Sequence, residues 1–252
     1  MRILFVCNEY PPSPHGGIGT FVKDLAQHLV ACGQEVIVVG YDPTVTNTQW
    51  RIEDNVSVLR IASPYRRWPQ INIGRYRLGM DVFLERWHLS RTVQKVCYEK
   101  GIDIVESYDW SGPLWSKPLN VPLVVRLHGA NTVHAYYEGR RVSRLLRYLE
   151  QRNVRMADAL VAVSRHIGDV TLEALGLNGR MFRVIYNGVD TQLFSPQPVD
   201  RDIAEVLYVG SLHRRKGIRE LLSAWSLVLS KCPQAHLSIV GRVPDGPNGV
   251  AL

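Results

Sequence analysis

The chain has 252 residues, of which 46% are hydrophobic and 21% charged, and its formal net charge is +7 at pH 7. This composition excludes a disordered or collagen-like chain, and the length can bury a sizeable core in one large domain or two modest ones. No apolar run approaches the ~20 residues that cross a bilayer, and the apolar residues 3–7 are too few for a signal peptide. The four cysteines form no CxxC pair, which favours reduced thiols in a cytoplasmic protein over a disulfide framework or a zinc site.

The first 190 residues alternate between short apolar runs, typical of buried strands, and stretches with helical spacing of apolar residues. Predicted strands cover residues 2–7, 35–40, 56–61, 103–106, 123–127, 159–163 and 182–185. The first predicted helix follows Thr20, which can cap it, and stops at Gly33; others cover 81–99, 144–156 and 167–175. Strands joined by helices in this way predict a doubly wound, Rossmann-like α/β fold with a parallel sheet.

A domain boundary is predicted after Asp190. Residues 191–203 lack periodicity and contain Pro196 and Pro198, as linkers do. Residues 204–252 then restart the pattern, with strands at 206–209 and 235–240 and a helix at 217–231. Because one helix and two strands cannot cover both faces of a sheet, this second unit is expected to be a fragment or to need a partner.

Glycines follow the first predicted strand, at the sheet edge where open α/β sheets bind ligands. Gly16 and Gly17 precede a helix, so backbone N–H groups and the positive helix end could meet a phosphate or a sugar. A tight turn is the alternative interpretation, and the spacing does not match the GxGxxG pattern of dinucleotide sites.

Polar residues follow the first predicted strand and later ones, namely Asn8, Asp109, His128 and Ser164. At a strand's carboxyl end, His128 could donate to a sugar hydroxyl or act as a base, and a half-buried, hydrogen-bonded histidine is the alternative. No HExxH motif or paired His/Cys cluster occurs, so no protein-held metal is expected.

Basic residues are denser at Arg66-Arg67, at Arg75 with Arg77 and from Arg140 to Arg147. They leave nucleic acid, anionic lipid and phosphorylated substrates open as partners, beside a plain solvated basic surface. Arg215 and Lys216 precede a predicted helix, where cations suit a diphosphate, although this feature by itself favours a solvated basic turn. The segment 65–77 mixes basic and aromatic residues and could lie against an anionic bilayer or bind a charged acceptor, or be a plain surface loop. Without an RNA-binding motif or zinc-finger spacing, no nucleic-acid partner is expected.

Taken together, these residues resemble glycosyltransferase family 4, retaining enzymes of the GT-B fold. The resemblance covers essentially the whole chain, and its motifs are Asn8-Glu9-Tyr10-Pro11-Pro12 with Gly16-Gly17, His128-Gly129, Ala157-Asp158 before Val163-Ser164, residues 185–190 with Phe194 and Pro196, and Val209-Gly210 with Lys216-Gly217. It implies an acceptor-side domain in residues 1–190, a linker in 191–203 and the truncated start of a donor-binding domain in 204–252.

The resemblance also implies roles for individual residues. Gly16 and Gly17 would approach the donor, with Ser164 and Arg215 as further donor contacts. His128 would contact the donor sugar, and Lys216 would contact the diphosphate. The family usually has arginine where this chain has Ser211, and it has two glutamates separated by seven residues late in its second domain. No two glutamates of this chain have that spacing.

The implied reaction is transfer of a sugar from a nucleotide diphosphosugar to an acceptor hydroxyl with retained configuration, without a cofactor or a metal. The acceptor could be a glycan, a lipid-linked molecule or a small molecule, and the protein is expected in the cytoplasm, with possible contact with the inner membrane face. Three alternatives stay open: an inactive fragment, half of a split enzyme, and a GT-B-fold sugar-nucleotide epimerase.

Overall fold

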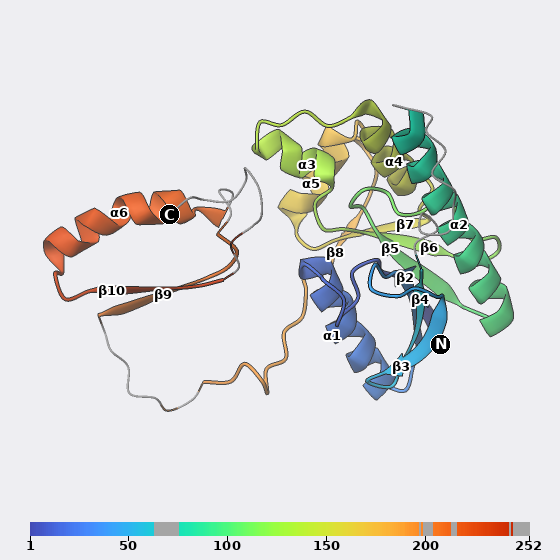
Figure 1. Ribbon diagram of the computed structural model, residues 1–252, viewed down its shortest axis with the longest axis horizontal. Coiled ribbons are helices and arrows are strands. Elements are labelled where there is room, and N and C mark those ends of the chain that lie inside the picture. Colours follow the sequence, from blue (N-terminus) through green and yellow to red (C-terminus); the bar gives the residue numbers. More distant parts are fainter. Residues whose placement is uncertain (63–75, 197, 199–203, 213–215, 242, 244–252) are drawn as a thin grey trace. The chain divides into compact units, whose positions relative to one another are not determined.

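The computed structural model describes residues 1–62, 76–196, 198, 204–212, 216–241 and 243 (Figure 1). The chain forms two compact units, Met1–Gly188 and Val189–Leu252, each described by itself. Of the predicted basic and aromatic segment 65–77, only the backbone of residues 76 and 77 is described, and Arg215 lies outside the described residues.

The first unit is built on one eight-stranded sheet. Its strands are β1 (Arg2–Val6), β2 (Glu35–Tyr41), β3 (Gln49–Glu53), β4 (Val56–Ile61), β5 (Ile104–Tyr108), β6 (Leu123–Leu127), β7 (Ala159–Ala162) and β8 (Arg183–Val184). The strand order is β3-β4-β2-β1-β5-β6-β7-β8, and every neighbouring pair is parallel except β3 with β4. The predicted doubly wound parallel sheet is therefore confirmed.

Helices cover both faces of this sheet because successive side chains of a strand point to opposite faces. Leu4 and Val6 of β1 join a core cluster with α2 (Tyr76–Lys100), α4 (Arg144–Arg155) and α5 (Arg165–Ala174). Ile3 and Phe5 join a separate cluster with α1 (Gly17–Ala31). In Figure 1, α1 (blue) and α2 (green) accordingly lie on opposite sides of the strands.

Three local features differ from the prediction. α1 begins at Gly17, with Gly16 as its N-cap, and Thr20 does not cap it: the Thr20 hydroxyl donates to the Gly16 carbonyl within the first turn. A short helix, α3 (Asn131–Tyr137), occupies a segment expected to be loop, and β3 was not predicted. The residues of β3 are mostly exposed, so no alternation of buried apolar residues marks that strand.

The described residues of the second unit form two parallel strands, β9 (Glu205–Val209) and β10 (His236–Val240), and one helix, α6 (Ile218–Lys231). Leu212 and Ile218 are the buried centre of its small apolar cluster. Larger apolar side chains are exposed, including Leu207 at 60%, Val209 at 71% and Leu227 at 68%. Such exposure is unusual for a complete domain, because a domain buries the apolar faces of its sheet.

Candidate active site

The strand order reverses at the centre of the sheet, between β1 and β5. From β1 the order runs outward through β2 on one side and through β5 on the other. Loops that leave neighbouring strands in opposite directions open a crevice beyond the carboxyl ends, which is where ligands bind in open α/β sheets. Asn8 follows β1 and Asp109 follows β5, so both lie at this switch point.

The two glycines predicted to approach the donor form the start of α1. A side chain added at Gly17 would meet nothing within 4 Å, and one at Gly16 would make only ordinary contacts with Glu9. Gly19 differs, because its added Cβ would lie 2.0 Å from the Glu9 carbonyl oxygen. Packing within the chain thus requires glycine at position 19 but not at 16 or 17, and the space beside Gly17 is open to a ligand.

A carboxylate of the protein itself, that of Glu9, lies next to the first turn of α1. Glu9 Oε1 accepts the N–H of Gly19 at 2.7 Å, while the N–H groups of Gly17 and Ile18 have no hydrogen-bond partner among the described residues. N–H groups at a helix start attract anions, and here one of them already has a carboxylate. Any phosphate bound here would therefore contact the remaining N–H groups beside Glu9.

His128 lies at the carboxyl end of β6, beside α1. Its ring packs edge-on against Phe21 of α1, with 5.2 Å between ring centroids. Burial lowers the pKa of His128 to about 4, and the positive charge of Arg126 acts in the same direction. The imidazole is therefore neutral near pH 7, which suits a hydrogen bond to a hydroxyl better than general-base catalysis, whose ideal pKa lies near the working pH.

Two buried carboxylates hold the loops around His128. Asp109, fully buried, accepts the N–H of His128 at 3.0 Å and that of Gly129 at 3.1 Å. Burial raises the pKa of Asp109 to about 7, against the lowering effect of those N–H donors. Glu150 of α4, also fully buried, accepts the N–H groups of Ser111 and of the first two residues of α3. These backbone N–H groups have no hydrogen-bond partner in the sheet. The two carboxylates therefore supply the acceptors that water would otherwise provide.

Ser164 is the N-cap of α5. Its hydroxyl oxygen accepts the N–H of Ile167 at 3.1 Å. A Cβ added at Gly129 would lie 3.7 Å from the side chain of Ile167, so the end of β6 adjoins the start of α5. The structure thus brings the start of α1, His128 and the start of α5 to one edge of the sheet, while Lys216 belongs to the second unit, where it is exposed and precedes the N-cap Gly217.

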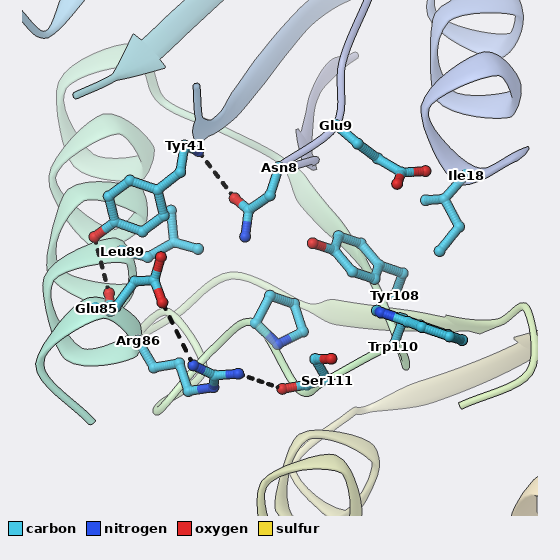
Figure 2. Close-up of a pocket in the computed structure, with 11 residues that line it drawn as sticks. Asn8, Glu9, Ile18, Tyr41, Glu85, Arg86, Leu89, Tyr108, Trp110 and Ser111 are labelled. Carbon is cyan, nitrogen blue, oxygen red and sulfur yellow. Dashed lines mark hydrogen bonds and ion pairs between the residues drawn. The ribbon is translucent and has the colours of Figure 1, made fainter. Parts of the chain in front are cut away.

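A cavity of about 280 Å³ lies at the switch point (Figure 2). Its lining comes from the loop after β1, the first turn of α1, the end of β2, α2, the end of β5 and the loop after β5, namely Asn8, Glu9, Ile18, Tyr41, Glu85, Arg86, Leu89, Tyr108, Trp110, Ser111 and Pro113. Ile18 follows Gly17 in the first turn of α1, so the cavity adjoins the start of that helix. Its volume is near the lower end of the ~300–1,000 Å³ typical of small-molecule sites.

The polar groups of this cavity have defined orientations. The Oδ1 atom of Asn8 accepts the backbone N–H of Tyr41 at 2.9 Å, which leaves its amide NH₂ to face the cavity (Figure 2). Burial raises the pKa of Glu85. The guanidinium of Arg86 donates to the carbonyl oxygens of Val82, Ser111 and Gly112, and it pairs with the Glu85 carboxylate at 3.7 Å (Figure 2). The cavity therefore offers one amide donor and the carboxylates of Glu9 and Glu85, beside aromatic rings.

The sequence marked part of this site. Asn8 and Asp109 were found because both follow predicted strands. Tyr41 follows the predicted strand 35–40 and could have been found by the same rule, whereas Glu85 and Arg86 lie within a long helix and carry no such signal. The described residues contain no group of three or more histidine, cysteine, aspartate or glutamate side chains suited to a metal ion.

The fold is that of the GT-B glycosyltransferases. Sucrose-phosphate synthase from Thermosynechococcus elongatus superposes with a TM-score of 0.67 at 18% identity, covering 98% of this chain and 64% of that one. The catalytic domain of starch synthase IV from Arabidopsis thaliana gives a TM-score of 0.58 at 14% identity, over 95% of this chain and 68% of that one. At these identities the likeness describes the fold alone.

Sequence similarity identifies the family. Residues 15–193, more than half of the chain, match Glycosyltransferase Family 4, and the chain belongs to that family. It is 28% identical over 260 residues to a glycogen synthase of Mycobacterium tuberculosis. It is also 28% identical over 247 residues to a GDP-mannose:cellobiosyl-diphosphopolyprenol alpha-mannosyltransferase of Xanthomonas oryzae.

The chain spans only part of these relatives. The two matches cover 96% and 97% of this chain but 62% and 61% of the relatives' own lengths. In the part of the chain that the structure describes, no helix has both the length and the apolar character to span a membrane.

Proposed function

We propose that the intact protein transfers a sugar from a nucleotide diphosphosugar to an acceptor hydroxyl with retention of configuration. The observation that carries this proposal is the cavity at the switch point, which adjoins both the start of α1 and the loop after β5. A ligand in the cavity would lie next to a helix start that suits a phosphate or a sugar. Two neighbouring subsites, one for each substrate, are what a transferase needs.

The donor side is proposed to use Gly16, Gly17, His128 and Ser164 of the first unit and Arg215 and Lys216 of the second. In the reaction the acceptor oxygen bonds to the anomeric carbon as the bond from that carbon to the diphosphate breaks on the same face. The hydroxyl proton passes to the departing phosphate oxygen. The proposed reaction uses neither a metal nor a cofactor. Lys216 and the helix starts would stabilise the leaving charge.

The acceptor is proposed to present a neutral sugar unit to the cavity. The carboxylates of Glu9 and Glu85 would accept hydrogen bonds from hydroxyl groups, and Glu9 would disfavour a phosphate, whereas Glu85 is paired with Arg86 at 3.7 Å. Arg86, the cation of the cavity lining, already donates to three carbonyl groups. The names of the relatives indicate two classes of acceptor, which are a glucan and a sugar carried on a diphosphopolyprenol. We place the protein in the cytoplasm, where nucleotide sugars would be its donors.

Activity is proposed to require a complete donor-binding domain. The family's pair of glutamates does not occur in these 252 residues, and the exposed apolar side chains of β9 and α6 are suited to further strands and helices. The remainder could belong to a longer chain or to a second polypeptide, and an inactive fragment is the alternative.

A chimera tests this function. A family-type donor half, with its glutamate pair, is joined after Gly241 and assayed with UDP-, GDP- and ADP-sugars and neutral oligosaccharides. We expect sugar transfer. NMR should show that the transferred sugar has the same anomeric configuration in the product as in the donor. His128→Ala and Lys216→Ala should each lower turnover by about 10²-fold or more, as for other preorganised electrostatic groups.

The matched control is His28→Ala, which removes an exposed histidine of α1. It should leave turnover within about twofold of the parent chimera. An active chimera that tolerates both His128→Ala and Lys216→Ala would overturn the residue roles, and an inverted product would overturn retention. Micromolar donor binding with robust turnover by the 252-residue chain alone would overturn the requirement for a complete donor domain.

A further inference from the structure

A buried ion pair lies in the sheet beside the candidate active site. Arg126 of β6 is 5% exposed, and its Nε donates to Glu106 Oε1 of β5 at 2.6 Å. Its other two nitrogens donate to the second Glu106 oxygen and to the Ile185 carbonyl, each at 3.4 Å. Each nitrogen of the guanidinium thus has an acceptor within the protein, so the fold fixes the orientation of this group.

The Arg126 guanidinium also lies over the ring of Phe21 in α1. Its Cζ atom is 4.7 Å from the ring centroid, within the range of a cation–π interaction. The same ring meets the His128 imidazole edge-on, at a centroid distance of 5.2 Å. Residues two apart in an extended segment point to the same face, as Arg126 and His128 do here. Phe21 therefore contacts both side chains and connects the start of α1 to them.

Arg126 contributes to the charge environment of His128. The titratable groups nearby are Arg126 itself, the buried Asp109 that accepts the His128 N–H, and His134 of α3. A Cβ placed on Gly129 would lie 3.2 Å from His134 Nε2, whereas α1 presents the uncharged Phe21. The positive charge of Arg126 lowers the pKa of His128, in the same direction as burial. It therefore helps to keep the imidazole neutral.

Stability of the core does not explain this ion pair. Taking two charges out of water costs about as much as their attraction returns, and an apolar pair of similar volume is often as stable or more stable. The other residues of β6 are apolar, and a methionine at position 126 would continue that pattern. A buried arginine at this point indicates a role in what it contacts, namely Phe21 and, through it, His128.

We propose that Arg126 is a positioning residue for sugar transfer. Through Phe21 it holds the His128 side chain and the start of α1 in the arrangement that receives the donor sugar. It acts through His128 and not on the substrate, because Glu106 and the Ile185 carbonyl accept bonds from all three of its nitrogens. This inference rests on the proposed function, in which His128 contacts the donor.

NMR of the 252-residue chain tests the positioning without a need for activity. The variant is Glu106→Gln with Arg126→Met, which removes the ion pair without leaving a buried carboxylate unpaired. The pKa of His128 should rise from about 4, and its ring protons should lose the shift that the Phe21 ring causes. Arg126→Lys keeps the charge but not the planar group, so it should keep the low pKa and still change the ring-proton shifts.

The matched control is Arg152→Met, which removes an arginine of α4 that lies over the Trp115 ring at 4.5 Å. It should leave the pKa and the ring-proton shifts of His128 unchanged. The proposal fails if the double variant has the parent's pKa and ring-proton shifts at His128. It also fails if the control changes them as much as the double variant does.

Turnover of the chimera with a complete donor half separates positioning from general support of the fold. Glu106→Gln with Arg126→Met should lower turnover about 10- to 100-fold, as a displaced contact does. In the His128→Ala chimera the same two substitutions should change it less than about twofold, because the positioned group is already absent. Equal losses in the two backgrounds would overturn the proposal. An inactive parent chimera would count against the proposed function, and the NMR result would still decide whether Arg126 positions His128.

Discussion

Glu150→Gln should destabilise the first unit and loosen the loops around His128. The Glu150 carboxylate is fully buried and accepts four hydrogen bonds. One oxygen accepts the N–H groups of Ser111 at 2.9 Å and Asn131 at 2.8 Å. The other accepts the N–H and the hydroxyl of Thr132. An amide has only one accepting oxygen, so this substitution cannot satisfy all four donors.

The magnitude follows from the donors. If the amide oxygen keeps Ser111 and Asn131, the Thr132 hydroxyl can turn to accept from the new NH₂ group. The Thr132 N–H is then buried without an acceptor, at a cost of about 1–3 kcal/mol. The two remaining bonds lose their charged acceptor, and relief of charge burial offsets part of that loss. A decrease of about 3 kcal/mol in the free energy of unfolding is expected, a large share of the ~5–15 kcal/mol typical of domains.

Urea unfolding at pH 7 measures this change, and hydrogen exchange at residues 131 and 132 reports the local loosening. The control is Glu173→Gln on α5, whose side chain is exposed, and which should change the free energy of unfolding by less than about 0.5 kcal/mol. A Glu150→Gln variant as stable as this control, with unchanged exchange at the start of α3, would refute the argument that one carboxylate holds both loops.

Other substitutions test the ion pairs and the second unit. Arg60→Met should cost about 3–5 kcal/mol in urea unfolding, because it leaves the buried Asp42 carboxylate unpaired; a loss no larger than that of the exposed Arg51→Met would count against this. His128, whose pKa is about 4, makes the fold lose stability as pH falls from about 6.5 toward 4, so His128→Gln should remove up to about 1.4 kcal/mol per pH unit of that slope; parallel pH curves for the two proteins would contradict it. Amides of β9 and β10 should exchange at lower free energy than those of β1, because their unit buries little apolar surface; equal protection in a monomer would disprove this.

The sheet was predictable from local pattern. Short apolar runs such as Leu123–Leu127 are buried on both faces and need no knowledge of their neighbours to be recognised as strands. The rule that ligands bind beyond carboxyl strand ends then singled out Asn8, His128 and Ser164 before their surroundings were known. The strand β3 escaped because its exposed side chains, such as Ile52, carry no pattern of burial.

Tertiary structure alone decided the interior of the site. Glu9 reaches the N–H of Gly19, and Asn8 binds the backbone of Tyr41, which is 33 residues away in the sequence. Glu85 joins the same cavity from the middle of α2. Such contacts depend on which strands become neighbours, and that is settled when the whole sheet is assembled. Periodicity reports only how each segment meets the core. The sequence by itself therefore determined the strands and helices that carry a burial pattern, and the edge of the sheet, whereas β3, α3, the cavity and its hydrogen bonds required the packed fold.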